Sequence, residues 1–259
     1  MPWRYLLLIL CWLWLPPSQA QEPVLPLYYI DKPPYYFTHA QQPSGFLLAR
    51  AMLILQTAGI SSQPRERPAP RILHELTRDH APFCSVGWFK TPEREAIAWF
   101  SEPIYQDVPM WLLVRQEDAG AMVKLKSLHT LLRAQYRIGV VSGFSYGATL
   151  DHQLDQALVP VDRQAKSVEI AIGRLLARRV DAIIADRVET TYLLNKQDLP
   201  SEKLLAVRFA DIPEGNHRYL MCSANLPSTT QQAINRAIAQ LTEQQLFSVS
   251  QEPDAEPIP

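Results

Sequence analysis

Short, continuous apolar segments alternate along most of this chain with longer segments in which apolar residues recur every three or four positions. The continuous segments are typical of buried strands, and the periodic segments are typical of helices with one buried face. The sequence predicts strands at 25–30, 81–86, 109–115, 137–141, 159–161, 181–185, 204–210 and 218–224. It predicts helices at 46–59, 71–78, 127–135 and 145–157, from 168, from 187, and over 228–246. Because strands and helices alternate, we expect mostly parallel sheets that helices cover on both faces.

Capping residues mark several of these helix ends. Thr91 and Ser167 are typical N-caps, Pro92 suits a first helical position, and Gly59 suits a helix stop. Arg94 is therefore predicted to lie at a strand-to-helix turn, where its guanidinium is available to a ligand. The segment 62–70 is rich in proline and arginine, and we expect it to connect two elements without regular structure.

The first twenty residues have the three parts of a secretory signal peptide. Arg4 supplies a positive charge, residues 5–15 are apolar, and Ser18 and Ala20 form a small-x-small cleavage site. Cleavage after Ala20 leaves 259 − 20 = 239 residues. No later stretch approaches the ~18 uninterrupted apolar residues of a membrane span. We therefore expect a soluble mature protein in the periplasm.

Charge and cysteine content exclude some classes of function. Loss of Arg4 leaves 24 basic and 26 acidic residues, a net charge of −2, with no basic stripe for nucleic acid. The sequence has no HExxH, CxxC or phosphate loop, and its scattered histidines have no ligand spacing, so we expect neither metal nor cofactor. Cys84 and Cys222 remain after cleavage, and both a disulfide between them and two separate buried thiols fit the sequence.

The most specific motif begins at Thr91. Arg94 follows three residues later, and Phe100, Ser101 and Tyr105 come after a short apolar segment. This pattern resembles the family-3 extracytoplasmic solute-binding proteins, the amino-acid-binding type that serves ABC transporters. The resemblance implies that Arg94 holds the carboxylate of the ligand, a task for which its planar fork of donors is suited.

The resemblance also implies the architecture, and it covers nearly the whole mature chain. We expect an α/β protein with a two-lobe periplasmic-binding-protein-like fold of type II, in which each lobe is a mostly parallel sheet flanked by helices. Two crossover hinge segments are expected near 106–109 and 211–215. The expected boundaries are 1–20 for the signal peptide, 21–108 and 214–250 for lobe 1, 109–213 for lobe 2, and 251–259 for a disordered tail.

Four further residues are assigned to the ligand by the same resemblance. The loop 139–147 resembles the family's glycine-rich loop, which places Ser145 and Tyr146 against the ligand carboxylate. Asp186, at the end of a predicted strand, corresponds to the acid that accepts the ligand's ammonium. Tyr35 follows two prolines and corresponds to an aromatic residue that packs on the solute.

The sequence departs from the family's pattern beside the motif. Phe89 and Gly87 stand where typical members have small hydroxyl residues, so side-chain hydrogen bonds are lost and apolar bulk is gained. The departures favour a ligand that is larger, more aromatic or less like an amino acid. Trp88 and Phe89 are predicted either to stack on that ligand or to fill the core.

Two other functions are compatible with parts of this sequence. Gly143-Phe-Ser145-Tyr-Gly147 matches the nucleophile elbow of serine hydrolases, and Asp186 and His217 follow in the expected order. No HGGG-type oxyanion segment precedes it. A stand-alone ligand-sensing protein of the same fold is the other alternative.

The sequence as a whole favours a binding protein rather than an enzyme. We expect it to act as a monomer, to capture a small polar or amino-acid-like solute by domain closure, and to present it to the permease of an ABC-type importer.

Overall fold

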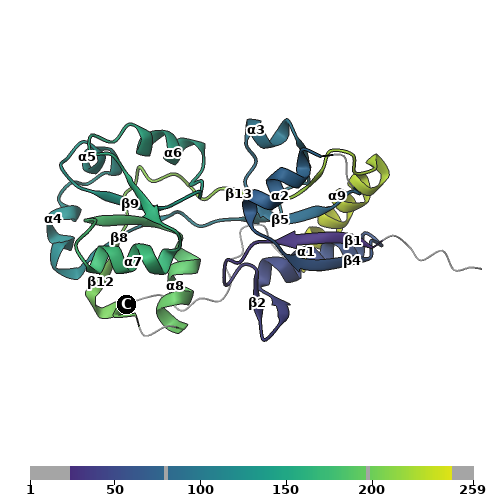
Figure 1. The fold of residues 1–259 in the computed structure, drawn as a ribbon, viewed down its shortest axis with the longest axis horizontal. Helices are drawn as coiled ribbons and strands as arrows, with labels where there is room; N and C mark the ends of the chain where they lie inside the picture. The colour runs from purple at the N-terminus through teal and green to yellow at the C-terminus, as the bar shows by residue number, and fades with distance from the viewer. Residues whose placement is uncertain (1–23, 79–80, 197–198, 247–259) are drawn as a thin grey trace, which may run out of the picture.

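The computed structural model describes residues 24–78, 81–196 and 199–246, which form two lobes arranged end to end (Figure 1). Each lobe is built around one main sheet with helices on both faces. The predicted signal peptide and C-terminal tail lie outside the described residues. Within the described ranges, no helix is long and apolar enough to cross a membrane.

The main sheet of lobe 1 has the strand order β4-β1-β5-β13-β6, and β7 also pairs with β13. Its strands are β1 (Leu25–Tyr29), β4 (Ser62–Glu66), β5 (Cys84–Trp88), β6 (Ala98–Phe100), β7 (Tyr105–Gln106) and β13 (His217–Ser223). Its helices are α1 (Phe46–Thr57), α2 (Ala69–Leu76), α3 (Pro92–Glu95) and α9 (Ser228–Glu243). A separate hairpin consists of β2 (Phe37–His39) and β3 (Gln42–Ser44).

The sheet of lobe 2 has the strand order β10-β9-β11-β8-β12. Its strands are β8 (Trp111–Arg115), β9 (Ile138–Val141), β10 (Asp162–Ala165), β11 (Ala182–Ala185) and β12 (Leu204–Val207). Its helices are α4 (Ala119–Val123), α5 (Leu128–Leu132), α6 (Ala148–Asp155), α7 (Val168–Leu176) and α8 (Arg187–Lys196). Two 3₁₀ turns, η2 (Gln116–Asp118) and η3 (Ser201–Lys203), precede α4 and β12.

Each sheet separates two apolar cores because successive strand residues face opposite sides. In β8, Leu112 packs in the core beneath α4, α5 and α6, whereas Leu113 packs in the core beneath α7 and α8. In lobe 1, α1 and α9 cover one face with residues such as Ile54 and Ile234, and α2 covers the other with Ile72. The periodic apolar pattern of the sequence is therefore used for packing in both lobes.

The segment 62–66 is a strand, and the prediction of an unstructured connection was wrong here. It forms the edge strand β4, which pairs in parallel with β1 and places Pro64 opposite Leu27. Proline has no N–H to donate, but an edge strand has one side without a partner, so proline is tolerated there. The polar composition of the segment concealed a strand that contributes little to the core.

The sheets are mixed, which corrects the expectation of mostly parallel sheets. Pairing is parallel in β4-β1-β5 and in β10-β9-β11, but β13 runs antiparallel to β5 and β6, and β8 runs antiparallel to β11 and β12. The reason lies in the chain's path between the lobes. β8 and β13 each enter their lobe directly from the other lobe, so they start at the end where the parallel strands finish.

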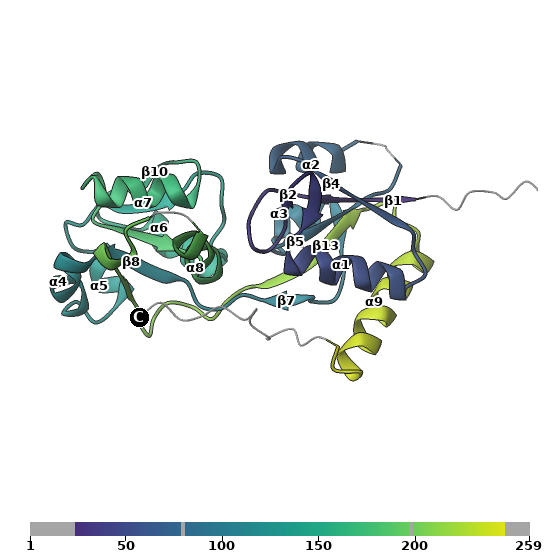
Figure 2. The ribbon, with the colours of Figure 1, turned by 90° about the horizontal axis from the view of Figure 1, so that it is seen from below.

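Two segments, 107–110 and 213–216, run side by side between the lobes (Figures 1 and 2). The amide of Asp107 donates to the carbonyl of Asn216 at 2.9 Å, and Gln106 Nε2 donates to the carbonyl of Gly215 at 3.3 Å. A Cβ atom on Gly215 would lie 1.5 Å from the carbonyl oxygen of Asp107, so this close approach requires glycine.

Cys84 and Cys222 are joined by a disulfide in this structure. They lie directly opposite each other on the antiparallel neighbours β5 and β13, and both are fully buried. Of the two arrangements that the sequence allowed, the structure contains the bridge, because the strand register brings the two side chains together.

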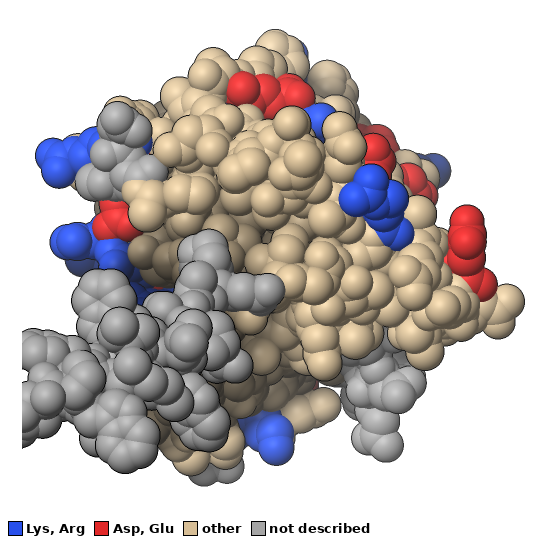
Figure 3. All heavy atoms as spheres, turned by 90° about the vertical axis from the view of Figure 1, so that its right-hand side faces the viewer, with Lys and Arg blue, Asp and Glu red and all other residues tan. Residues whose placement is uncertain are grey.

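The described surface at the end of lobe 1 carries small groups of both charge signs. Viewed from this end, basic and acidic side chains are scattered among uncharged ones (Figure 3). This distribution agrees with the nearly balanced charge of the sequence.

Candidate functional site

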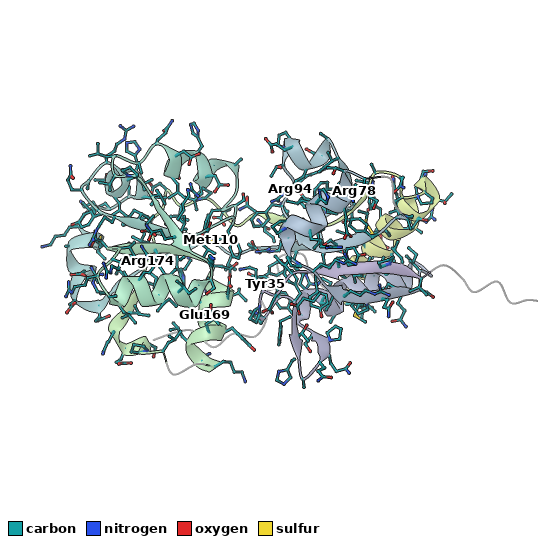
Figure 4. The ribbon with its side chains drawn as sticks, viewed as in Figure 1. Tyr35, Arg78, Arg94, Met110, Glu169 and Arg174 are labelled. Carbon is teal, nitrogen blue, oxygen red and sulfur yellow. A yellow bond between two sulfur atoms is a disulfide. The ribbon has the colours of Figure 1, made fainter. Side chains whose placement is uncertain are left out.

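A cavity of about 310 Å³ lies between the two lobes, and residues of both lobes line it. Figure 4 shows Tyr35 and Arg94 of lobe 1 and Met110 of lobe 2 around this region. The volume is at the low end of the roughly 300–1,000 Å³ of ligand pockets, so the cavity suits a small molecule.

One strand of lobe 1, β5, and two strands of lobe 2, β9 and β11, end at this cavity. The residues that follow β5, β9 and β11 all contribute to its wall, among them Phe89, Phe144 and Asp186. In open α/β sheets, ligands bind beyond the carboxyl ends of the strands, where such loops meet. The topology thus brings three loops, separated by up to about a hundred positions in the chain, to one place.

Arg94 is fixed at the cavity by the short helix α3. Thr91 caps this helix, and its hydroxyl accepts from the amide of Arg94 at 3.4 Å. The Arg94 guanidinium donates through Nη1 to the carbonyl of Phe89 at 2.8 Å and lies 4.9 Å from the ring of Trp88. Arg94 forms no ion pair with any residue that the structure describes, so its remaining donors are available to an anion.

Two aromatic residues after β5 form an apolar wall. The indole N–H of Trp88 donates to Ser85 Oγ at 2.8 Å, which fixes the ring, and the ring of Phe89 stacks 4.7 Å from the guanidinium of Arg218. Both residues line the cavity. The structure therefore brings Trp88, Phe89 and Arg94 together, as the motif suggested.

Asp186 lies at the end of β11 with its carboxylate already occupied. The Tyr35 hydroxyl donates to Oδ1 at 3.0 Å and lies 2.9 Å from Oδ2, and the amide of Glu189 donates to Oδ1 at 3.0 Å. Arg218 Nη2 and Lys32 Nζ lie 3.5 Å and 3.8 Å from Oδ2. Three of these groups come from lobe 1, so Asp186 links the lobes.

Lys32 is a buried cation that the sequence analysis did not single out. Its ammonium forms a hydrogen-bonded ion pair with Glu189 of α8 and lies 5.2 Å from the ring centre of Phe144. Only 5% of Lys32 and 7% of Glu189 is exposed, so both charges depend on each other for stability. This pair joins lobe 1 to lobe 2 beside the cavity.

Arg218 is the second buried cation of lobe 1. Its Nε donates to Asp107 Oδ1 at 2.6 Å, and its Nη1 donates to the carbonyl of Gly87 at 3.0 Å and to the Tyr36 hydroxyl at 3.3 Å. Asp107 Oδ2 is buried without a hydrogen-bond partner among the described residues. We name the five charged residues Lys32, Asp107, Asp186, Glu189 and Arg218 the interlobe network.

Burial raises the pKa values of the carboxyl groups in the network, and pairing with Lys32 or Arg218 lowers them. Burial raises the pKa of Asp107 to about 6 although Arg218 opposes the shift. Burial would also raise the pKa of Asp186, but Lys32 and Arg218 hold it below its ordinary value. Burial raises the pKa of Glu189 despite the ion pair with Lys32.

The loop after β9 binds a carboxylate of its own chain. The Ser145 hydroxyl donates to Asp151 Oδ2 at 2.6 Å, and the amide of Tyr146 donates to Asp151 Oδ1 at 2.9 Å. The Tyr146 hydroxyl accepts from the amide of Val141 at 2.8 Å and is buried in the core of lobe 2. Ser145 and Tyr146 line the cavity, but the polar groups predicted for a ligand carboxylate are engaged by Asp151.

Tyr35 does not line the cavity, which corrects its predicted place on the solute. It is fully buried, its hydroxyl bonds to Asp186, and its ring packs 4.5 Å from the guanidinium of Arg218. The next residue, Tyr36, lines the cavity instead. The two rings lie in the same core with their centres 6.1 Å apart, and the aromatic triplet alone did not reveal which of them reaches the cavity.

The residues of the hydrolase alternative do not form a triad in this structure. The Ser145 hydroxyl donates to Asp151, Asp186 accepts from Tyr35, and His217 is exposed beside the ring of Tyr219. The described residues also contain no group of three or more metal-ligating side chains.

A family model of bacterial extracellular solute-binding proteins, family 3, matches residues 28–251. This range includes both lobes and every residue of the site. The chain belongs to this family. It is a family 3 extracellular solute-binding protein.

Solved structures show the fold of this solute-binding protein. An arginine-bound amino acid ABC transporter substrate-binding protein from Streptococcus pneumoniae is 20% identical with a TM-score of 0.63, covering 86% of this chain and 90% of its own. The arginine-, lysine-, histidine-binding protein ArtJ from Geobacillus stearothermophilus is 18% identical with a TM-score of 0.66. The match covers 86% of this chain and 90% of ArtJ. The ancestral amino acid-binding protein AncCDT-1, a precursor of cyclohexadienyl dehydratase, is 20% identical with a TM-score of 0.64. The match covers 85% of this chain and 90% of AncCDT-1. No curated protein matches the chain.

Sequence reasoning on this solute-binding protein missed the cations Lys32 and Arg218 and the acid Glu189. Glu189 lies three residues after Asp186 in the first turn of α8, where acidic residues are common on the exposed surface, so no local pattern signalled its burial. Lys32 and Arg218 sit beside turn and strand residues with no distinguishing pattern.

Proposed function

We propose that this solute-binding protein captures one small solute in the cavity between its lobes and presents the closed form to the permease of an ABC-type importer. The observation that carries the proposal is the cavity itself, whose wall is made by both lobes around the unpaired guanidinium of Arg94. A solute that contacts both walls favours the closed arrangement, because it binds that arrangement better than an open one. Solved neighbours from amino acid ABC transporters support the proposal.

We place this activity in the periplasm, after signal-peptide cleavage behind Ala20, and we propose that the protein acts as a monomer without a nucleic-acid partner. The family is extracellular, and the charges of the sequence are nearly balanced. N-terminal sequencing of the exported protein tests the cleavage site, and a mature chain that begins elsewhere contradicts it.

We also propose a binding role rather than ester hydrolysis, because the Ser145 hydroxyl is committed to Asp151. A chromogenic ester assay on the wild type and on Ser145→Ala tests this. Turnover that disappears in Ser145→Ala would establish the hydrolase instead.

The proposed function is tested by thermal shift of the mature chain with amino acids, amines, small carboxylates and aromatic metabolites. A solute at 100 times its Kd adds about 2.7 kcal/mol to the free energy of unfolding. We expect Arg94→Ala to weaken the binding of that solute about 10- to 100-fold, since a hydrogen bond between charged groups contributes ~1.5–3 kcal/mol.

The matched control is Arg236→Ala. Arg236 is exposed on α9, outside the cavity, so this variant is expected to bind like the wild type. Unchanged binding by a folded Arg94→Ala variant contradicts the assignment of Arg94. A panel without any hit contradicts the proposed function.

A further inference from the structure

The two carboxylates that line the cavity are both neutralised by lobe 1. Glu189 is paired with Lys32, and Asp186 accepts from Tyr35 and Arg218 with Lys32 also nearby. The ammonium of a solute needs a carboxylate that is free to accept it, because a buried cation without a partner is strongly disfavoured. Neither carboxylate in the wall is free for that purpose.

The cations of the wall are not balanced in the same way. Lys32, Arg94 and Arg218 line the cavity against the two acids Asp186 and Glu189. Asp107 balances Arg218 from behind the wall and does not reach the cavity. Arg94 is thus the one lining cation that forms no ion pair among the residues that the structure describes. Glu93 and Asp151 act on it only through longer-range attraction, and it still has donors to offer in a planar fork.

The rest of the wall is mainly apolar. Aromatic rings from both lobes, including those of Trp88, Phe89 and Phe144, face the cavity together with aliphatic side chains such as Leu73 and Ile184. Three hydroxyl residues reach the cavity from lobe 2: Ser145 already donates to Asp151, the Tyr146 hydroxyl accepts from the amide of Val141, and Ser142 is exposed at the start of the loop. A solute that fills this space must therefore be largely apolar.

We propose that the solute is a small carboxylate with an aromatic or branched apolar body and no ammonium group, and that Arg94 holds its carboxylate. The inference rests on the proposed function and specifies the chemical class of its solute. It separates this cavity from one built for a zwitterion, in which an acid of the wall must remain available for the ammonium.

Two matched sets of probes test the class by titration calorimetry on the mature chain. The first is 3-phenylpropionate, L-phenylalanine and phenethylamine, and the second is 4-methylpentanoate, L-leucine and isopentylamine. Within each set the apolar body is constant, while the charged groups are the carboxylate alone, both groups, or the ammonium alone. We expect at least one carboxylate to bind, its amino acid to bind at least tenfold more weakly, and its amine not to bind.

The outcomes separate this inference from the proposed function. Equal or tighter binding of the amino acid overturns the inference, and so does failure of both carboxylates. An amino acid that binds at least as tightly as its carboxylate, and that loses this affinity in Arg94→Ala, overturns the inference while leaving the proposed function intact. A silent broad panel together with silent matched sets overturns both.

The Lys32→Met variant tests why the cavity disfavours an ammonium group, which we attribute to the pairing of the wall carboxylates with Lys32. Lys32→Met keeps an unbranched side chain that is one atom shorter but removes its charge, so Asp186 and Glu189 lose a partner. We expect the ratio of amino-acid to carboxylate affinity to rise at least tenfold in Lys32→Met and to stay unchanged in Arg236→Ala. Because a ratio does not depend on the fraction of folded protein, an unchanged ratio in Lys32→Met overturns the inference.

Discussion

At the scale of the residue, the central feature is a set of charges that are buried and paired across long stretches of chain. Asp186 is the clearest case, since it receives donors from Tyr35 and Arg218 of the opposite lobe. Pairing keeps the pKa of Asp186 low in an environment where burial alone would raise it. A carboxylate held in this way contributes to structure even though it lines a cavity.

Asp107 is expected to make stability depend on pH. Burial raises its pKa in the folded protein from 3.8 to about 6, while Arg218, Asp186 and Lys32 act on it from nearby elements. Between these two pKa values the folded state holds more protons than the unfolded state, so this carboxyl makes the free energy of unfolding fall as pH rises from about 4 to about 6. Above about pH 6 its contribution no longer changes.

The measurement is urea unfolding of the wild type and of Asp107→Asn from pH 4 to pH 8. Asparagine does not titrate, so the difference between the two proteins isolates this carboxyl. We expect the wild type to lose stability relative to the variant up to about pH 6, with a constant difference above it. A difference that does not vary with pH contradicts the prediction.

At the scale of the element, the crossing segments and the helix α3 decide where the functional groups lie. α3 is only one turn long, yet its Thr91 cap and its position after β5 direct Arg94 into the cavity. The two crossing segments lie so close that the carbonyl oxygen of Asp107 occupies the position that a Cβ atom on Gly215 would need. Small local features therefore set the geometry between the lobes.

Gly215→Ala is expected to destabilise the protein. Its Cβ would lie 1.5 Å from the carbonyl oxygen of Asp107, so the crossing segments must separate and lose the hydrogen bonds between them. We expect a loss of at least ~2 kcal/mol in the free energy of unfolding, measured by urea denaturation.

Gly173→Ala is the matched control for this change. Gly173 is exposed within α7, and a Cβ there meets nothing within 4 Å. Alanine should raise stability by roughly 0.5–1 kcal/mol, because it favours the helix over glycine. Similar effects of the two substitutions would show that the crossing segments tolerate a side chain.

At the scale of the whole molecule, the interlobe network joins the lobes from within the cleft. Lys32, Tyr35 and Arg218 of lobe 1 meet Asp186 and Glu189 of lobe 2. These contacts need no solute, so we expect the protein without solute to spend much of its time closed. A solute then adds to an arrangement that the chain already favours.

Asp186→Asn is expected to open the solute-free protein. Loss of the negative charge weakens the attraction of Asp186 to Lys32 and Arg218, so small-angle X-ray scattering should give a larger radius of gyration than for the wild type. Asp155→Asn is the control, because Asp155 is exposed and pairs with Arg163 inside lobe 2. An Asp186→Asn protein as compact as the wild type contradicts a closing role for the network.

Local patterns determined most of the elements from the sequence alone. The apolar periodicity predicted α1 and α9, the serine cap predicted the start of α7, and a short apolar run predicted β9. The motif from Thr91 predicted the family and placed Arg94 at the cavity, because a capped turn after a strand is a local arrangement. Strand β4 was missed since its few residues on an edge carry no apolar signal.

Only the tertiary structure decided which charges meet. Lys32 and Glu189 are 157 positions apart, and Tyr35 and Asp186 are 151 positions apart. Their pairing depends on how two sheets are joined by two crossing segments, and no residue near either partner signals it. Periodicity and capping act over a few residues and are written in the sequence, whereas the occupation of a buried carboxylate depends on the position of a side chain in the opposite lobe.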